Sequence, residues 1–260
     1  MTFSLRLTAD LTLALAARAF GNKQGYPPIL QLSPDTNFHT APASFSASAQ
    51  QTDNNNSRQS GALVSRFRSP IVWVSGSEPL VYAEVPRFTN ALAASGRSVF
   101  LETCGALLKR RLHEFQPSDR FYFTVRFDGL ALTHDQRNAG EDSIPVAMEA
   151  IRMARLAGFL TCALLVLHPQ MSPGEVEQLH AETRRLDIDG CLIIRAARAP
   201  EQEKMVKQLR SRLLSWRWAM LSDLVESVAL PADSRDSSQM DRRALPEAQP
   251  GDFEEGAEAG

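Results

Sequence analysis

The stretch that decides the fold is IVWVSGSEPL, residues 71–80. Its first four residues are β-branched or aromatic, a composition that favours a β-strand. The five residues that follow end the strand in a turn, because glycine and proline interrupt regular structure. A short apolar strand followed by a turn or a helix is the unit that recurs along the chain.

Five further stretches have the same apolar character, and helical segments separate the later ones. Gly96 and Gly158 suit left-handed caps that end two of the helices, and Ser172 with Pro173 is a typical helix start. Strands that alternate with helices predict an α/β fold, a partial (β/α)6 TIM-like barrel with a parallel sheet. The predicted strands are 29–32, 71–74, 98–102, 121–127, 161–167 and 190–194, and the predicted helices are 85–94, 105–115, 144–157 and 173–186.

The two ends of the chain and the first βα unit differ from the rest. We expect an N-terminal helical region over 1–25 and the barrel over 26–196, in which 35–69 forms a mobile loop because it is rich in Ser, Gln and Asn. A C-terminal region over 197–230 is predicted to be one helix from Glu201 to Val228. Residues 231–260 are acidic and poor in apolar residues, which predicts a disordered tail.

Composition narrows the class of protein. With 260 residues, 43% of them hydrophobic, and a net charge of −2, the chain can bury one core and offers no electrostatic attraction for nucleic acid. Its three cysteines form neither a disulfide framework nor a Cys-x-x-Cys metal spacing, which fits a reducing cytoplasm. No apolar run is long enough to cross a bilayer. Asp10 precedes the apolar segment 11–17, so we interpret that segment as an amphipathic helix that packs on the barrel rather than as a signal peptide.

Several short blocks, in matching order and spacing, resemble the radical S-adenosylmethionine (SAM) superfamily. The block at 72–80 resembles the strand and Gly-Gly-Glu-Pro turn that hold the amino group of SAM, and the block at 99–108 resembles the next strand with its Thr-Asn-Gly turn. Further blocks resemble the hopanoid-biosynthesis branch, whose members attach the adenosyl group of SAM to a hopene: 26–34, 125–130, 133–135 and 147–151. The resemblance extends from about Tyr26 to Ile194.

The position of the family's iron–sulfur loop holds no cysteine. Where that family has Cys-x3-Cys-x2-Cys, this sequence has Phe38, Pro42 and Phe45. Thiolates hold the iron of such clusters, and neither an aromatic ring nor a proline can replace them. Cys104 follows a strand whereas Cys162 and Cys191 begin theirs, so the three thiols are not expected to meet. We therefore expect no cofactor and no metal, and a [4Fe–4S] cluster only if unrecognised ligands exist.

The resemblance also implies a residual SAM pocket, which two substitutions weaken. Ser77 replaces the second glycine of the turn, and Cys104 replaces the asparagine of the next block. The turn could equally be retained for the fold, and Glu78 could accept a hydrogen bond from a ligand amine or cap a helix. The candidate SAM-binding residues are Gly76, Ser77, Glu78, Pro79, Thr103, Cys104 and Asp128.

Three functions follow as hypotheses. The first is a pseudoenzyme, a non-catalytic binding or regulatory partner linked to hopanoid or lipid biosynthesis. The second is a radical SAM transferase that moves an adenosyl group from SAM to a hopene-type lipid. The third is a cluster-independent enzyme that uses Glu78, Asp128 and His134 as acid–base groups.

Partners and location follow from the same resemblance. We expect a protein partner, no nucleic acid and a cytoplasmic location, with peripheral contact at the inner membrane if the substrate class is a lipid. The helix with Trp216 and Trp218 is a candidate contact surface, because aromatic residues are enriched in interface cores. The competing interpretation is that this helix covers the open side of the incomplete barrel. The basic stretch 109–111 is interpreted as a solvated helix face.

Overall fold

The computed structural model describes residues 3–19, 27–34, 68–128, 143–197 and 200–230. These residues belong to one compact unit, Met1–Leu230. Most of the loop predicted over 35–69, the tail predicted over 231–260 and the block at 133–135 lie outside the described residues. No described helix is both long enough and apolar enough to span a lipid bilayer.

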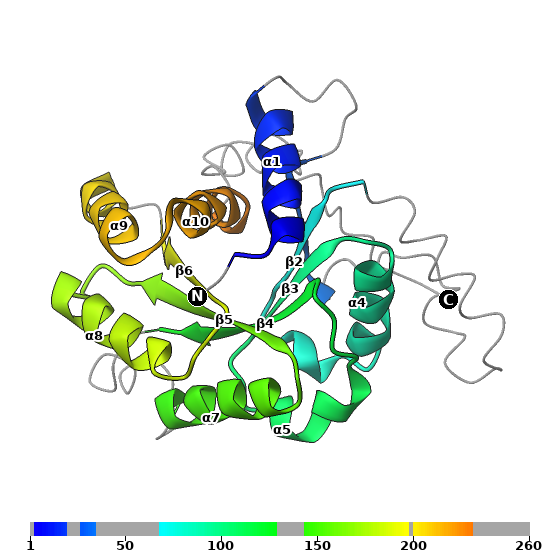
Figure 1. The fold of residues 1–260 in the computed structure, drawn as a ribbon. Helices are drawn as coiled ribbons and strands as arrows, with labels where there is room; N and C mark the ends of the chain where they lie inside the picture. Colours follow the sequence, from blue (N-terminus) through cyan, green and yellow to red (C-terminus); the bar gives the residue numbers. More distant parts are fainter. Residues whose placement is uncertain (1–2, 20–26, 35–67, 129–142, 198–199, 231–260) are drawn as a thin grey trace, which may run out of the picture. The chain divides into compact units, whose positions relative to one another are not determined.

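A six-stranded parallel sheet forms the centre of this unit (Figure 1). The strands follow one another in the sheet in the order of the sequence, which is the arrangement of a barrel that has not closed. The predicted partial barrel is therefore confirmed, with every predicted strand within one residue of the observed limits. The strands are β1 (Ile29–Leu32), β2 (Ile71–Val74), β3 (Ser98–Thr103), β4 (Phe121–Phe127), β5 (Leu160–Leu167) and β6 (Gly190–Arg195).

Helices that connect successive strands cover the outer face of the sheet (Figure 1). Aromatic side chains fill the space beneath them, where Phe121, Phe123 and Phe159 pack edge to face with ring centroids 4.9–6.1 Å apart. Ser172 caps α8 through a complete capping box with Glu175, as the sequence indicated. These helices are α4 (Val85–Ala94), α5 (Leu108–Arg111), α7 (Ser143–Leu156) and α8 (Pro173–Arg184).

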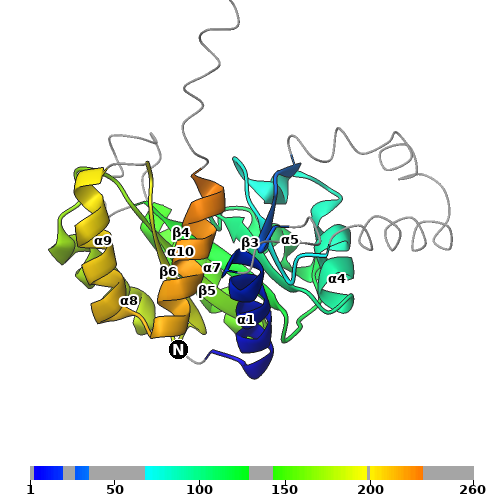
Figure 2. The ribbon, with the colours of Figure 1, turned by 90° about the horizontal axis from the view of Figure 1, so that it is seen from above.

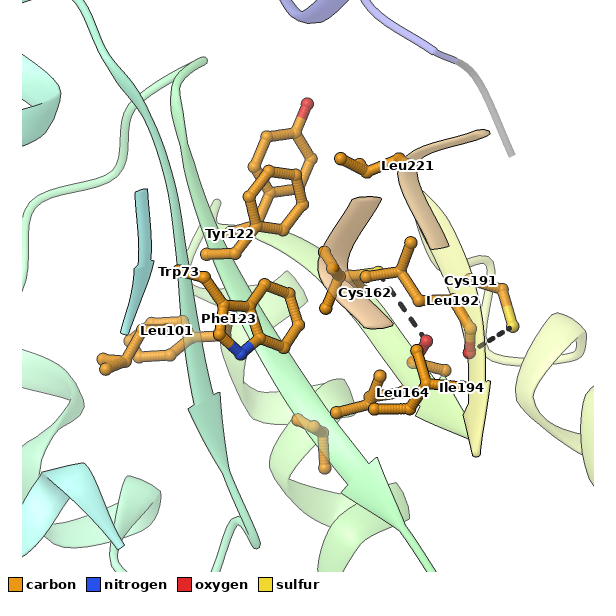
Figure 3. Packing of buried hydrophobic residues seen from close by; sticks show 14 of the residues in the cluster. Trp73, Leu101, Tyr122, Phe123, Cys162, Leu164, Cys191, Leu192, Ile194 and Leu221 are labelled. Carbon is orange, nitrogen blue, oxygen red and sulfur yellow. Dashed lines mark hydrogen bonds between the residues drawn. The ribbon is translucent and has the colours of Figure 1, made fainter. Parts of the chain in front are cut away.

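The inner face of the sheet has a second aromatic row. The register pairs Trp73 with Phe100 and Phe100 with Tyr122, and the rings stack with centroids 5.9 Å and 4.6 Å apart. Leu164, from β5, belongs to the same buried cluster (Figure 3). This row supplies the apolar core on which the last helices pack.

The open side of the barrel is covered by helices from both ends of the unit. Helix α10 (Trp216–Ala229) packs on β6 and β1, and α1 (Leu5–Ala19) packs on β2 and on α10 (Figures 1 and 2). Trp218 is 1% exposed and lies against Gly190, where an added Cβ would come within 2.2 Å of its ring. Trp218 therefore serves the fold, whereas Trp216 is 63% exposed.

Two helix predictions were wrong in detail. The single helix predicted from Glu201 to Val228 is two helices, α9 (Pro200–Leu213) and α10, because Ser215 adopts an extended conformation with ψ 157°. The helix predicted over 105–115 shortens to α5 followed by a 3₁₀ turn at Leu112–Glu114. Gly105 lies at φ +90°, outside the helical region, so the chain turns before the helix starts.

Candidate functional site

The carboxyl ends of the strands form a polar mouth with two adjoining cavities. They share Gly76, Glu102 and Arg126. The β3 cavity, of about 230 Å³, is lined by Gly76, Ser77, Pro79, Glu102, Thr103, Cys104, Arg126 and Asp128. The β6 cavity, of about 250 Å³, is lined by Gln31, Ser33, Ser75, Gly76, Glu102, Arg126, Val166, Ile194, Arg195, Ala196, Ala229 and Leu230. Of the seven candidate SAM-binding residues, all but Glu78 line the β3 cavity.

The Glu78 carboxylate is bound within the protein. Its Oε1 accepts a hydrogen bond from the backbone N–H of Leu80 at 3.0 Å, which caps the 3₁₀ turn Pro79–Val81. Its Oε2 accepts bonds from Thr103 Oγ1 at 3.0 Å and from the Cys104 N–H at 2.9 Å. Glu78 therefore fastens the end of β2 to the end of β3. These bonds account for the glutamate without a ligand.

The Thr103–Gly105 turn is also held by internal bonds. Thr103 Oγ1 accepts the N–H of Gly105 at 3.0 Å. A Cβ on Gly105 would lie 2.7 Å from the Cβ of Ala150 on α7, so the turn packs closely against that helix. Partial burial, then the hydrogen bond with Glu78, raises the pKa of the Cys104 thiol to about 11. At neutral pH this thiol is protonated and a poor nucleophile.

A charged cluster crosses the floor of the mouth. Arg126 donates from Nε to Asp128 Oδ1 at 2.8 Å and from Nη1 to Glu102 Oε1 at 3.3 Å. Burial raises the pKa of Glu102, and the charge of Arg126 opposes that rise. Burial would lower the pKa of Arg126, but Asp128 and then Glu102 outweigh it and raise that pKa. His168 Nε2 lies 3.3 Å from Asp128 Oδ1. The cluster thus alternates acidic and basic side chains, from Glu102 through Arg126 and Asp128 to His168.

Sequence reasoning missed the most central members of this cluster. Glu102 and Arg126 were treated only as parts of their strands, and His168 was not considered. The available signal was a charged side chain near the carboxyl end of an otherwise apolar strand, where barrels place their functional residues. Glu102 pairs in register with Thr124, two positions before Arg126, so both side chains lie on the inner face.

The described cysteines do not fit an iron–sulfur cluster. Cys104 is exposed at the mouth, whereas Cys162 and Cys191 are buried at the opposite ends of β5 and β6. Burial raises the pKa of both buried thiols far above neutral pH. Within the described ranges, no group of three or more His, Cys, Asp or Glu side chains is placed to hold a metal ion. Phe38, Pro42, Phe45 and His134 lie outside those ranges.

The chain has only limited structural similarity to the solved structures that it matches. Streptococcus suis SuiB matches with a TM-score of 0.48 and 10% identity, covering 63% of this chain and 42% of SuiB. SuiB bound to S-adenosylmethionine matches with a TM-score of 0.48 and 12% identity, covering 63% and 41%. TYW1 with a lysine–pyruvate adduct matches with a TM-score of 0.43 and 12% identity, covering 60% of each chain. The match thus spans about two fifths of SuiB, and no curated protein has detectable similarity to the chain.

The family model gives the firmer result. Residues 58–182 match the model of the Radical SAM superfamily. The matched segment includes β2 to β5, and with them every described residue that lines the β3 cavity. That segment, slightly less than half of the chain, is therefore similar to a radical SAM superfamily domain.

Proposed function

We propose that this protein is a cluster-less radical-SAM-like pseudoenzyme that acts as a binding or regulatory partner in hopanoid or related lipid biosynthesis. The observation that carries the proposal is the sequence at the three ligand positions, Phe38, Pro42 and Phe45. Reductive cleavage of SAM needs an electron from a [4Fe–4S] cluster held by thiolates. Without those thiolates the domain has no electron source.

Internal bonding at the β3 cavity supports a retained scaffold. Glu78 and Thr103, two matches to the SAM-binding blocks, are engaged in bonds that join β2 to β3. Selection for the fold alone would keep both residues. Because the β3 cavity remains, binding of SAM or a nucleotide without a chemical reaction is compatible with this function. We propose that the biological role lies in binding a protein partner.

The decisive experiment compares the protein with a variant whose cluster ligands are restored. Both are purified and reconstituted without oxygen, and iron, sulfide and the visible spectrum are measured. The wild type is expected to remain without a cluster, while the triple variant Phe38→Cys, Pro42→Cys, Phe45→Cys takes up iron and sulfide, because it regains the Cys-x3-Cys-x2-Cys spacing. A stoichiometric cluster in the wild type, with cleavage of SAM to 5′-deoxyadenosine, would overturn the proposal.

The second candidate is a radical SAM transferase that adds an adenosyl group to a hopene. The blocks at 26–34, 125–130 and 147–151, which resemble the hopanoid branch, favour it. Against it, the β3 and β6 cavities, of about 230 Å³ and 250 Å³, are each smaller than the roughly 300–1,000 Å³ typical of ligand pockets. Incubating reconstituted protein with SAM, a reductant and a hopene tests it, and an adenosylated product would establish it over the first proposal.

A further inference from the structure

The β6 cavity has two chemically different walls. One wall is apolar and comes from β5, β6 and the end of α10, with Val166, Ile194 and Ala229 as examples. The other is polar and comes from β1 to β4, with Gln31 and Arg126 among its members. A ligand that fits must therefore carry a polar group at one end and an apolar body at the other.

Arg126 supplies the polar wall with an uncommitted donor. Its Nε is bound to both oxygens of Asp128, at 2.8 Å and 3.0 Å, and its Nη1 to Glu102 at 3.3 Å. Nη2 has no partner among the described residues, and the side chain is 38% exposed at the cavity. The two carboxylates fix the guanidinium plane, so its free edge is already oriented before a ligand arrives.

Unlike Arg126, the Glu102 carboxylate on the polar wall is not available to a ligand, because both of its oxygens are already bonded within the protein. Glu102 is 8% exposed; its Oε2 accepts from Trp73 Nε1 at 3.1 Å, and its Oε1 accepts from Arg126. A second guanidinium, that of Arg195, also lines the cavity and is held by Glu226, with Nε 2.7 Å from Oε1. Both guanidinium groups are thus paired with carboxylates, and the cavity presents the Nη2 N–H of Arg126, for which a carboxylate is the strongest acceptor.

From these features we infer that the β6 cavity binds a small carboxylate with a short, branched apolar chain. The carboxylate accepts from Nη2 of Arg126, and the chain packs on Val166, Ile194 and Ala229. A volume of about 250 Å³ admits a small acid but not a bulky lipid. The β6 cavity shares Gly76, Glu102 and Arg126 with the β3 cavity, whereas Ser77 and Cys104 line the β3 cavity alone, so the two cavities adjoin and can be probed separately.

Isothermal titration with two probes of equal shape tests the charge requirement. 3-Methylbutanoate is expected to bind with a dissociation constant of about 1 mM. 3-Methylbutanamide should bind about tenfold more weakly, because only the acid forms a charge-assisted hydrogen bond with Arg126. The variant R126Q should reduce binding of the acid by a similar factor while its thermal melting stays cooperative. Equal binding of acid and amide, or no binding of the acid at about 10 mM, would overturn the inference.

Two filling variants identify the cavity and do not rely on Arg126. Ala229→Phe places a ring in the β6 cavity, and Ser77→Phe places one at the rim of the β3 cavity. A229F should abolish binding of the acid, whereas S77F should leave it within about twofold. Loss of binding in S77F with retention in A229F would contradict the assignment, even if the acid itself binds.

Discussion

The two ends of the barrel differ in composition: the end at the amino ends of the strands is packed and largely apolar, and the end at the carboxyl ends is polar. At the amino ends of the strands, Trp218 and α1 cover the aromatic core, and the buried Asp10 and Ser98 are bonded to each other. At the carboxyl ends, charged side chains surround two cavities. The first end stores stability and the second offers binding groups, the division that barrels of this class show.

This difference teaches that residues at the mouth of a barrel can serve its stability as well as a ligand. Glu78 and Thr103 sit at the mouth, yet they make bonds that hold the strands together. Residues at positions that resemble a ligand site can therefore hold the fold together. Substitutions at the base should cost the most stability, and those at the mouth should cost less unless they disturb a packed turn.

The largest effect is expected at the base, from Trp218→Ala. Trp218 is 1% exposed, and its removal would leave a cavity next to Gly190, which costs about 3–5 kcal/mol of unfolding free energy. Trp216→Ala is the matched control, because the same residue type on the same helix is 63% exposed and should change stability by less than about 0.5 kcal/mol. Urea unfolding followed by circular dichroism measures both. Equal losses would mean that α10 does not seal the barrel.

The next effect tests the one tightly packed turn of the mouth. Gly105→Ala combines left-handed backbone strain with a Cβ 2.7 Å from that of Ala150, and should cost about 2–4 kcal/mol. Gly96→Ala has nearly the same φ, +88°, but nothing within 4 Å of the new Cβ, so strain alone should cost about 1–2 kcal/mol. Thermal and urea unfolding of the pair isolate the contact between the turn and α7. If G105A is no worse than G96A, that contact is absent.

A smaller effect is expected where α1 is attached to the base. Asp10 Oδ2 accepts bonds from Ser98 Oγ at 2.6 Å and Arg120 Nη1 at 2.8 Å, so Asp10→Ala should lower stability by about 2 kcal/mol. Asp119→Ala removes the exposed pair with Arg6 and should cost less than about 1 kcal/mol. Denaturant midpoints report both. A larger loss in D119A than in D10A would contradict the role assigned to the buried tie.

The smallest effect concerns the pH dependence of the mouth. Burial raises the pKa of Glu102 in the folded protein above its ordinary value of 4.5, which applies to the unfolded chain. At a pH between the unfolded and the folded pKa, the unfolded chain has therefore released a proton that the folded protein keeps. Unfolding is favoured as pH rises through that window, and the loss is complete above the folded pKa. Glu102→Gln should remove this component. Urea unfolding of both proteins at a series of pH values from about 4 to 7 measures it, and parallel curves would show that Glu102 does not titrate differently in the two states.

The strands could be predicted because each one is recognisable from its own sequence, without knowledge of its neighbours in the sheet. Each is a short apolar run, most are bounded by a glycine, proline or aspartate, and burial on both faces of most strands favours a parallel sheet. The break between α9 and α10 was missed because apolar residues continue through Leu214 and Trp216, and only Ser215 indicated a new helix start. A single serine is a weak signal within a long apolar pattern.

The site was predictable only in part. Motif blocks identified six of the eight residues that line the β3 cavity, because each of the six lies in a short block of recognisable sequence, but Glu102 and Arg126 were missed. The β6 cavity combines Gln31, Arg195 and Ala229, which come together only because α10 packs on both β1 and β6. No local pattern contains that information. The charged floor depends in the same way on the register between β3 and β4.

The docking of α1 has a consequence for synthesis of the chain. Helix α1 ends at Ala19, but its partner α10 begins at Trp216, and Asp10 must wait for Ser98 and Arg120. At ribosomal rates of about 5–20 residues per second, α1 leaves the exit tunnel roughly ten to forty seconds before its full binding surface exists. Helix α1 is therefore made long before it can dock fully, and throughout that interval its apolar face, which includes Leu7 and Leu11, lacks α10 as a partner.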